Sequence, residues 1–224
     1  MKDIIFDLYG TLIDIYTNES SKAFWIKCAN KFKKYKAYKP NKLKKDYLYL
    51  CNLYSKEKEE IDLLLVFKKL FDAEDDVALK IAKDFRRLSI KKIKIFNGAY
   101  NLLNDLKKLG YRIYLLSNAQ KCFTEYELKK FKIDKFFNDI FISSEYGIKK
   151  PNLDFFKALL KKNNIKEAIM IGNDYFADII PASRLGLKTI YIETGTSKKT
   201  LNVPKINGFI KKDILIKIKN FNLS

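Results

Sequence analysis

The sequence of 224 residues contains no histidine. This absence excludes mechanisms that need an imidazole base, such as Ser-His-Asp hydrolysis, and it excludes histidine-ligated zinc. The three cysteines, Cys28, Cys51 and Cys122, are widely separated and odd in number, which is typical of free thiols in a reducing cytosol. Catalysis by this chain would therefore depend on carboxylates, hydroxyls, lysine and a metal ion that prefers oxygen ligands.

Long apolar runs are also missing. The longest, residues 63–67, is far too short to span a bilayer, and the few apolar residues between Asp3 and Asp7 do not form a signal peptide. We therefore expect a cytoplasmic protein without a membrane segment. A hydrophobic content of 47% is ordinary for a globular protein, and the length suffices for one sizeable core with a smaller subdomain.

Acidic residues are few compared with basic ones: 26 aspartates and glutamates against 45 lysines and arginines give a net charge of +19. Nine lysines and no acid lie between residues 27 and 45, interleaved with aromatic residues, and such a stretch can bind nucleic acid. However, the chain has 41 lysines and four arginines, and bidentate recognition of phosphate and guanine favours arginine. Because lysine is spread over the whole chain, we interpret it as solvated surface and expect no nucleic acid partner.

Five short apolar segments suit strands that are buried on both faces of a parallel sheet. They are residues 4–6, 113–116, 140–142, 168–171 and 189–192. Helical patterns alternate with the later segments. The pattern at residues 99–110 has an apolar stripe of Leu102, Leu103, Leu106 and Leu109 and stops at Gly110, and a second pattern opens with Pro151. This alternation predicts an α/β fold with a doubly wound, Rossmann-like parallel sheet.

The interval between the first two predicted strands is much longer than a single crossover helix requires. It contains several amphipathic helical patterns, for example at residues 59–72 and 75–89. We therefore predict an α/β core formed by residues 1–14 and 96–224, with an inserted helical cap at residues 15–95.

Polar residues follow four of the predicted strands, and in an open parallel sheet ligands bind beyond the carboxyl ends of the strands. Each of these residues alone is equally well explained by a turn or a helix cap. Taken together they predict a functional crevice, which collects Asp7, Ser117, Asn118, Lys149, Lys150, Asn173 and Asp174.

Four short motifs resemble, in order, those of the haloacid dehalogenase (HAD) superfamily of aspartate-nucleophile hydrolases and phosphatases. They are DLYGT (residues 7–11), LLSNA (115–119), GIKKPNLDFF (147–156) and IGNDYFAD (171–178). The motifs extend over nearly the whole chain. The position of the predicted cap, between the first two motifs, resembles one branch of this superfamily.

The resemblance implies that Asp7 is the nucleophile and forms an aspartyl-enzyme intermediate. Thr11 would orient this carboxylate or the bound anion, and Lys150 would offset the negative charge. The Ser117 hydroxyl and the Asn118 backbone N–H would bind an oxygen of a small anionic substrate.

The resemblance also implies a Mg²⁺ ion as cofactor. Its ligands would come from Asp7, the Tyr9 carbonyl, Asn173 and Asp174, with Asp178 as a ligand or as a partner of the ligands.

Two positions depart from the phosphatase pattern. Most phosphatases of the superfamily carry a second aspartate, the acid and base for the leaving group, where this chain has Tyr9; tyrosine there resembles the 2-haloacid dehalogenase branch. In the fourth motif Asn173 follows Gly172, where the phosphatase pattern has an aspartate that binds the metal. Either Asp174 takes over as the metal ligand, or the amide oxygen of Asn173 replaces the usual carboxylate.

These departures leave three hypotheses. We favour a Mg²⁺-dependent phosphatase of a small phosphorylated metabolite, since loss of a general acid typically costs about 10²–10⁴-fold and the fourth motif keeps two spaced carboxylates. The alternatives are a 2-haloacid dehalogenase and a weakened, polyanion-binding module. The dehalogenase branch uses an arginine early in the cap, and the first arginine here is Arg86. Arg86 or Arg87 could bind the substrate anion, although a solvated helix face is the simpler interpretation.

Overall fold

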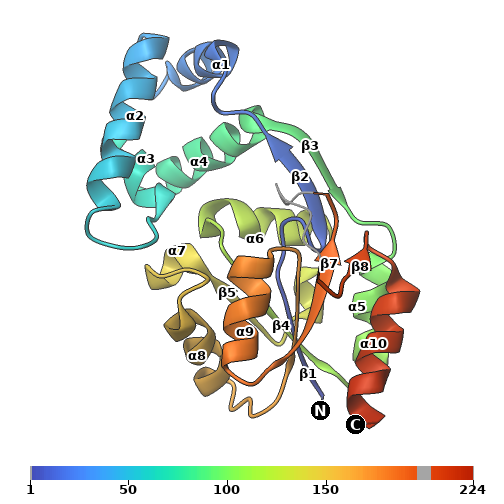
Figure 1. Cartoon of the computed structure of the whole chain (residues 1–224). Helices are drawn as coiled ribbons and strands as arrows, with labels where there is room; N and C mark the ends of the chain where they lie inside the picture. Colours follow the sequence, from blue (N-terminus) through green and yellow to red (C-terminus); the bar gives the residue numbers. More distant parts are fainter. Residues whose placement is uncertain (1, 196–202, 224) are drawn as a thin grey trace.

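The computed structural model describes residues 2–195 and 203–223. Its centre is a six-stranded sheet in the order β5-β4-β1-β6-β7-β8, in which every neighbouring pair is parallel (Figure 1). The strands are β1 (Asp3–Phe6), β4 (Arg112–Ser117), β5 (Asp139–Ile142), β6 (Ile169–Gly172), β7 (Lys188–Glu193) and β8 (Ile206–Asn207). The predicted α/β fold is confirmed. All five predicted strands are present, and the short β8 is an addition.

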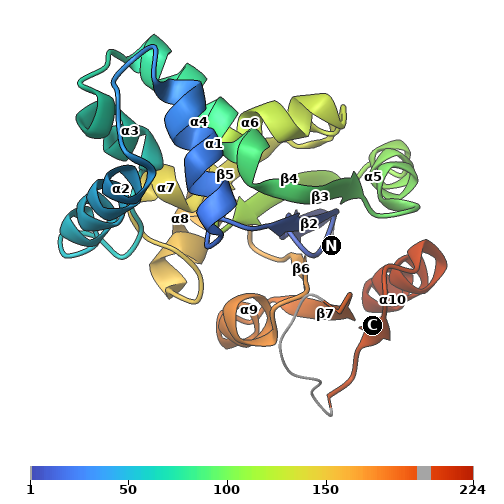
Figure 2. The same ribbon diagram turned by 90° about the horizontal axis from the view of Figure 1, so that it is seen from above.

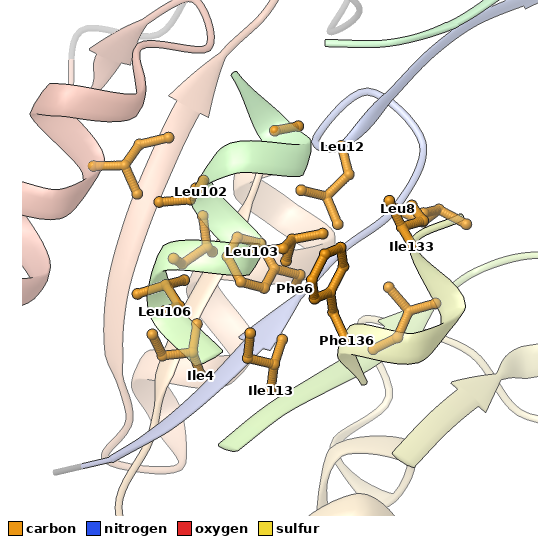
Figure 3. Close-up of a cluster of buried hydrophobic side chains, with 14 of the residues drawn as sticks. Ile4, Phe6, Leu8, Leu12, Leu102, Leu103, Leu106, Ile113, Ile133 and Phe136 are labelled. Carbon is orange, nitrogen blue, oxygen red and sulfur yellow. The ribbon is translucent and has the colours of Figure 1, made fainter. Parts of the chain in front are cut away.

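Both faces of the sheet are covered because successive side chains of a strand point to opposite faces. Ile4 and Phe6 of β1 belong to one apolar cluster and Ile5 belongs to another (Figure 3). The first cluster is completed by α5 (Ala99–Lys108), α6 (Lys121–Lys130), η1 (Asp134–Phe136) and α10 (Lys211–Leu223). On the second face lie α7 (Ser143–Tyr146), α8 (Leu153–Lys162) and α9 (Ile180–Arg184).

A two-stranded antiparallel ribbon, β2 (Ile13–Thr17) and β3 (Ile90–Ile95), leads out of the sheet region and back. Between its strands lie α1 (Lys22–Phe32), α2 (Pro40–Tyr54), α3 (Leu63–Phe71) and α4 (Asp75–Ser89), which we call the helical segment. This segment has its own aromatic-rich cluster, to which α6 contributes Phe123. It lies beyond the carboxyl ends of the strands, over the half of the sheet with β4 and β5 (Figures 1 and 2).

Two local predictions needed correction. Helix α8 begins at Leu153, with the Asn152 side chain accepting the Asp154 N–H at 2.9 Å, so Pro151 precedes the helix and does not lie in its first turn. Leu109 is largely exposed at the end of α5 and does not join its buried stripe. The predicted stop at Gly110 is present, with φ at +80°.

The aromatic residues of the basic stretch face inward. Phe32 is buried in the cluster of the helical segment, and the Tyr38 hydroxyl donates to the Leu70 carbonyl at 2.8 Å. These rings are therefore engaged in packing and do not form an exposed platform on which bases could stack. Across residues 2–195 and 203–223, no helix combines the length and the apolar character needed to cross a membrane.

Candidate active site

Asp7 lies immediately after β1, where its N–H donates to the Ile171 carbonyl at 3.0 Å. Its side chain is nearly buried, with Oδ1 2.8 Å from Lys150 Nζ and Oδ2 3.0 Å from Thr11 Oγ1. Gly10 turns the chain sharply after the strand with φ at +86°, a conformation that favours glycine. The apolar strand and this turn hold the carboxylate at the rim of the sheet.

Lys150 is the central charge of the site and is only 3% exposed. Its Nζ lies 2.8 Å from Asp7 Oδ1 and 2.6 Å from Asp178 Oδ1. Burial lowers the pKa of Lys150, but the two carboxylates outweigh burial and raise that pKa overall. Burial also raises the pKa of Asp178 to about 7, with Lys150 acting in the opposite direction. Lys150 therefore remains a cation between two acidic groups.

Asn118 positions the loop that carries Lys150. Its Nδ2 donates to the Lys150 carbonyl and its Oδ1 accepts the Lys150 N–H, both at 2.8 Å. The neighbouring Ser117 Oγ is buried, and in the described part of the chain it has no hydrogen-bond partner. Buried polar atoms are normally satisfied, so this hydroxyl is suited to a ligand oxygen.

The fourth motif turns its two carboxylates in different directions. Asp174 is exposed, and its Oδ1 accepts the N–H groups of Phe176 and Ala177 at 2.9 Å, which caps η2 (Tyr175–Ile179). Asp178 points inward to Lys150, and its Oδ2 accepts the Asp174 N–H at 3.0 Å. A Cβ at Gly172 would lie 2.2 Å from Asp178 Oδ2, so only glycine permits this approach.

Asn173, and not Asp174, faces the nucleophile. Asn173 is buried, and its Oδ1 lies 3.0 Å from Thr11 Oγ1, the same hydroxyl that contacts Asp7. The surrounding cavity of about 150 Å³ is lined by Asp7, Tyr9, Asn118, Lys150, Asn173, Asp174, Ala177 and Asp178.

The chemistry of this donor set fits a Mg²⁺ ion that also binds substrate oxygens. Mg²⁺ is commonly bound by one or two carboxylates together with substrate phosphate oxygens, and Asp7 and Asn173 offer one carboxylate and one amide oxygen. Lys150 adds a positive charge beside them. Within residues 2–195 and 203–223, no three Asp, Glu, Cys or His side chains are grouped as a metal cluster.

The Tyr9 side chain is directed to α6. Its hydroxyl donates to Glu127 Oε2 at 2.5 Å and lies 3.1 Å from Thr124 Oγ1. Sequence reasoning missed both partners. The sequence does contain one indication of the role of Glu127. This residue falls on the apolar stripe of α6 with Phe123 and Leu128, and a carboxylate buried there needs a charged or hydrogen-bonding partner.

That partner is Arg86 of α4, whose Nε lies 2.7 Å from Glu127 Oε1. Arg86 is 16% exposed and Arg87 is 68% exposed, so the interpretation as a solvated helix face is wrong for Arg86 and correct for Arg87. Arg86 lines a second cavity of about 320 Å³ that shares Tyr9 and Asn118 with the smaller one. The predicted residues Asp7, Thr11, Lys150, Asn173 and Asp178 are thus joined by direct contacts, while Arg86 lies in the adjoining cavity.

Comparisons with known proteins agree with this architecture. A family model described as haloacid dehalogenase-like hydrolase matches residues 4–192. A glyceraldehyde 3-phosphate phosphatase of Pyrococcus abyssi is 34% identical over 100 residues, which covers 44% of this chain and 42% of that protein. The chain thus aligns with less than half the length of that relative.

Two further comparisons extend over almost the full length. A pyrophosphatase PpaX of Bacillus anthracis is 23% identical over 233 residues, covering 99% of this chain and 98% of that protein. The crystal structure of a 2-haloacid dehalogenase from Pseudomonas syringae superposes with a TM-score of 0.67 at 15% identity, covering 99% of both chains. At this identity the structural match supports the fold and not the reaction.

Proposed function

The chain belongs to the haloacid dehalogenase-like hydrolase family, and from this premise we propose that it is a phosphatase of a small phosphorylated metabolite, with Asp7 as nucleophile. The observation that carries the proposal is the Asp7–Lys150–Asp178 arrangement beneath a small polar cavity. A fixed ammonium group 2.8 Å from Asp7 Oδ1 offsets the negative charge of the carboxylate and attracts an anionic substrate. The names of relatives, a glyceraldehyde 3-phosphate phosphatase and a pyrophosphatase, also support phosphoryl transfer.

In the proposed reaction an Asp7 oxygen attacks the phosphorus and forms a new O–P bond while the P–O bond to the leaving group breaks. Water then attacks the phosphorus of the aspartyl phosphate, which releases inorganic phosphate and restores the Asp7 carboxylate. The Ser117 hydroxyl and the Asn118 backbone would bind the phosphoryl oxygens, and Thr11 and Lys150 hold the nucleophile in place. When bound by Asp7, the Tyr9 carbonyl and Asn173, Mg²⁺ would neutralise charge on these oxygens.

We also propose that residues 15–95 act as a cap over a core formed by residues 1–14 and 96–224. Two groups of contacts link the helical segment to the core beside the larger cavity. One is the Arg86–Glu127 ion pair, and the other centres on Gln120, which accepts the Leu63 N–H at 2.7 Å and donates to the Ile61 carbonyl at 2.8 Å.

A substrate test separates this function from the alternatives. Turnover of p-nitrophenyl phosphate and of 2-chloropropionate would be measured with Mg²⁺ and with a chelator, for the wild type and for Asp7→Asn. We expect Mg²⁺-dependent phosphate release that the substitution removes. Chloride release without metal would establish instead the dehalogenase function, for which Tyr9 is a specific indication. Salt-sensitive binding of nucleic acid without turnover of either substrate would favour the polyanion-binding module.

The metal site gives a second prediction. Asn173→Asp supplies a second carboxylate beside Asp7, so we expect Mg²⁺ to bind about tenfold more tightly or better, which corresponds to about 1.4 kcal/mol. Asp174→Asn is the matched control, because Asp174 is exposed and asparagine preserves the cap of η2. Isothermal titration with Mg²⁺ measures both variants. Weaker binding by Asp174→Asn, with no gain in Asn173→Asp, would assign the ligand to Asp174.

A further inference from the structure

The Tyr9 hydroxyl is hydrogen-bonded to a buried carboxylate. The hydroxyl donates to Glu127 at 2.5 Å, and Glu127 is 2% exposed on α6. The phenol therefore directs its proton to α6 and not to a group bound beside Asp7.

Arg86 forms an ion pair with Glu127, the acceptor of the Tyr9 hydroxyl. Its Nε and Nη2 lie 2.7 and 3.3 Å from the two Glu127 oxygens, and the guanidinium carbon lies 5.4 Å from the centre of the Tyr9 ring. Burial lowers the pKa of Arg86, but the hydrogen bonds and charges of Glu127 and Tyr9 together outweigh burial, so the pKa is raised overall. A phenol held by such a pair is fixed in one orientation.

The other acidic groups that line the cavity around Asp7 are engaged as well. Asp178 is 1% exposed, and its Oδ1 is held by Lys150 and its Oδ2 by the Asp174 N–H. Lys150 donates to Asp7 and Asp178. Asp174 is exposed and accepts two backbone N–H groups. Among the described residues that line this cavity, the acidic side chains other than Asp7 and the exposed Asp174, namely Tyr9 and Asp178, are therefore held by protein partners and are not free to turn towards a departing oxygen.

We propose that the site selects phosphorylated substrates whose leaving group departs as a stable anion without being protonated by the protein, namely acyl phosphates, phosphoanhydrides and aryl or enol phosphates. This inference rests on the proposed phosphatase function. As the Asp7 O–P bond forms and the P–O bond breaks, the leaving oxygen keeps the electron pair and takes its proton later from water. Simple alkyl phosphates, whose alkoxide is a poor leaving group, are turned over slowly.

The test is a series of phosphates whose leaving groups span acidic phenols to aliphatic alcohols, assayed with Mg²⁺. For the wild type, log kcat/KM should fall steeply as the leaving group becomes more basic. Tyr9→Asp places a carboxyl group beside the nucleophile, so it should flatten the slope and raise turnover of alkyl phosphates by about 10²–10⁴-fold. Thermal unfolding of each variant verifies that the fold is intact.

Tyr9→Phe is the matched control, since it keeps the ring and removes only the hydroxyl. If the phenol supplies no proton to the leaving group, the slope of the series stays the same. A steeper slope in Tyr9→Phe, or wild-type rates that do not depend on the leaving group, would overturn the inference while leaving the phosphatase function intact. Failure of the wild type on every phosphate of the series, p-nitrophenyl phosphate included, would instead refute the proposed function.

Discussion

Asp7→Asn is expected to reduce phosphate ester turnover by about 10⁴-fold or more, because the amide is a poor nucleophile and cannot form the aspartyl phosphate. The fold should persist. Asparagine has nearly the same shape, and removal of one carboxylate leaves Lys150 paired with Asp178 at 2.6 Å. The steady-state rate with p-nitrophenyl phosphate measures the loss, and mass spectrometry of acid-quenched enzyme detects the phosphorylated protein only in the wild type.

Asp3→Asn is the matched control for this experiment. Asp3 is a buried aspartate on the same strand, at the end remote from the site, where it pairs with Arg112 at 2.5 Å. Its substitution should preserve turnover. Equal losses in Asp3→Asn and Asp7→Asn would mean that β1 tolerates no amide and that the loss carries no information on the nucleophile. If Asp7→Asn retained turnover, Asp7 would not be the nucleophile.

The sheet and the gathering of polar residues could be predicted because both depend on local pattern. A continuous apolar run such as residues 168–171, bounded by polar residues and glycine, is typical of a strand buried on both faces of a sheet. The polar residues that follow parallel strands lie together at the carboxyl edge of the sheet. The ribbon of β2 and β3 was missed. Its strands are only partly buried, and each pairs with a segment far along the chain, so the local apolar signal is weak.

The direction of individual side chains could not be predicted. Glu127 is 118 residues from Tyr9 in sequence, and nothing local to Tyr9 indicates which side chain will receive its proton. Asp174 and Asn173 illustrate the same limit, because aspartate is equally suited to a metal site and to a helix N-cap. The chain geometry after β6 turns Asp174 outward and Asn173 inward, which depends on tertiary packing.

Lys150→Met is expected to lower the free energy of unfolding by about 3–5 kcal/mol, because it leaves two buried carboxylates without their cation. The second variant, Lys150→Met with Asp178→Asn, removes one of these charges and should recover most of the loss. Urea unfolding of the wild type, both single variants and the double variant gives the coupling free energy between Lys150 and Asp178. Additive effects would show that the two groups do not interact in solution.

The pH dependence of the Lys150→Met deficit provides an independent check. In the wild type the folded pKa of Asp178 is raised to about 7, and Lys150 restrains that rise, so its removal moves the pKa higher. A carboxyl group with a folded pKa above its unfolded value stabilises the protein when protonated, and this stability is lost as pH rises through the folded pKa. The deficit should therefore be small near pH 5 and largest above pH 8.

Lys162→Met is the control variant. It breaks an exposed pair with Asp139 and should show a much smaller deficit because water screens that pair. A Lys150→Met deficit that is equal at pH 5 and pH 8 would show that the ionisation of Asp178 is not coupled to Lys150.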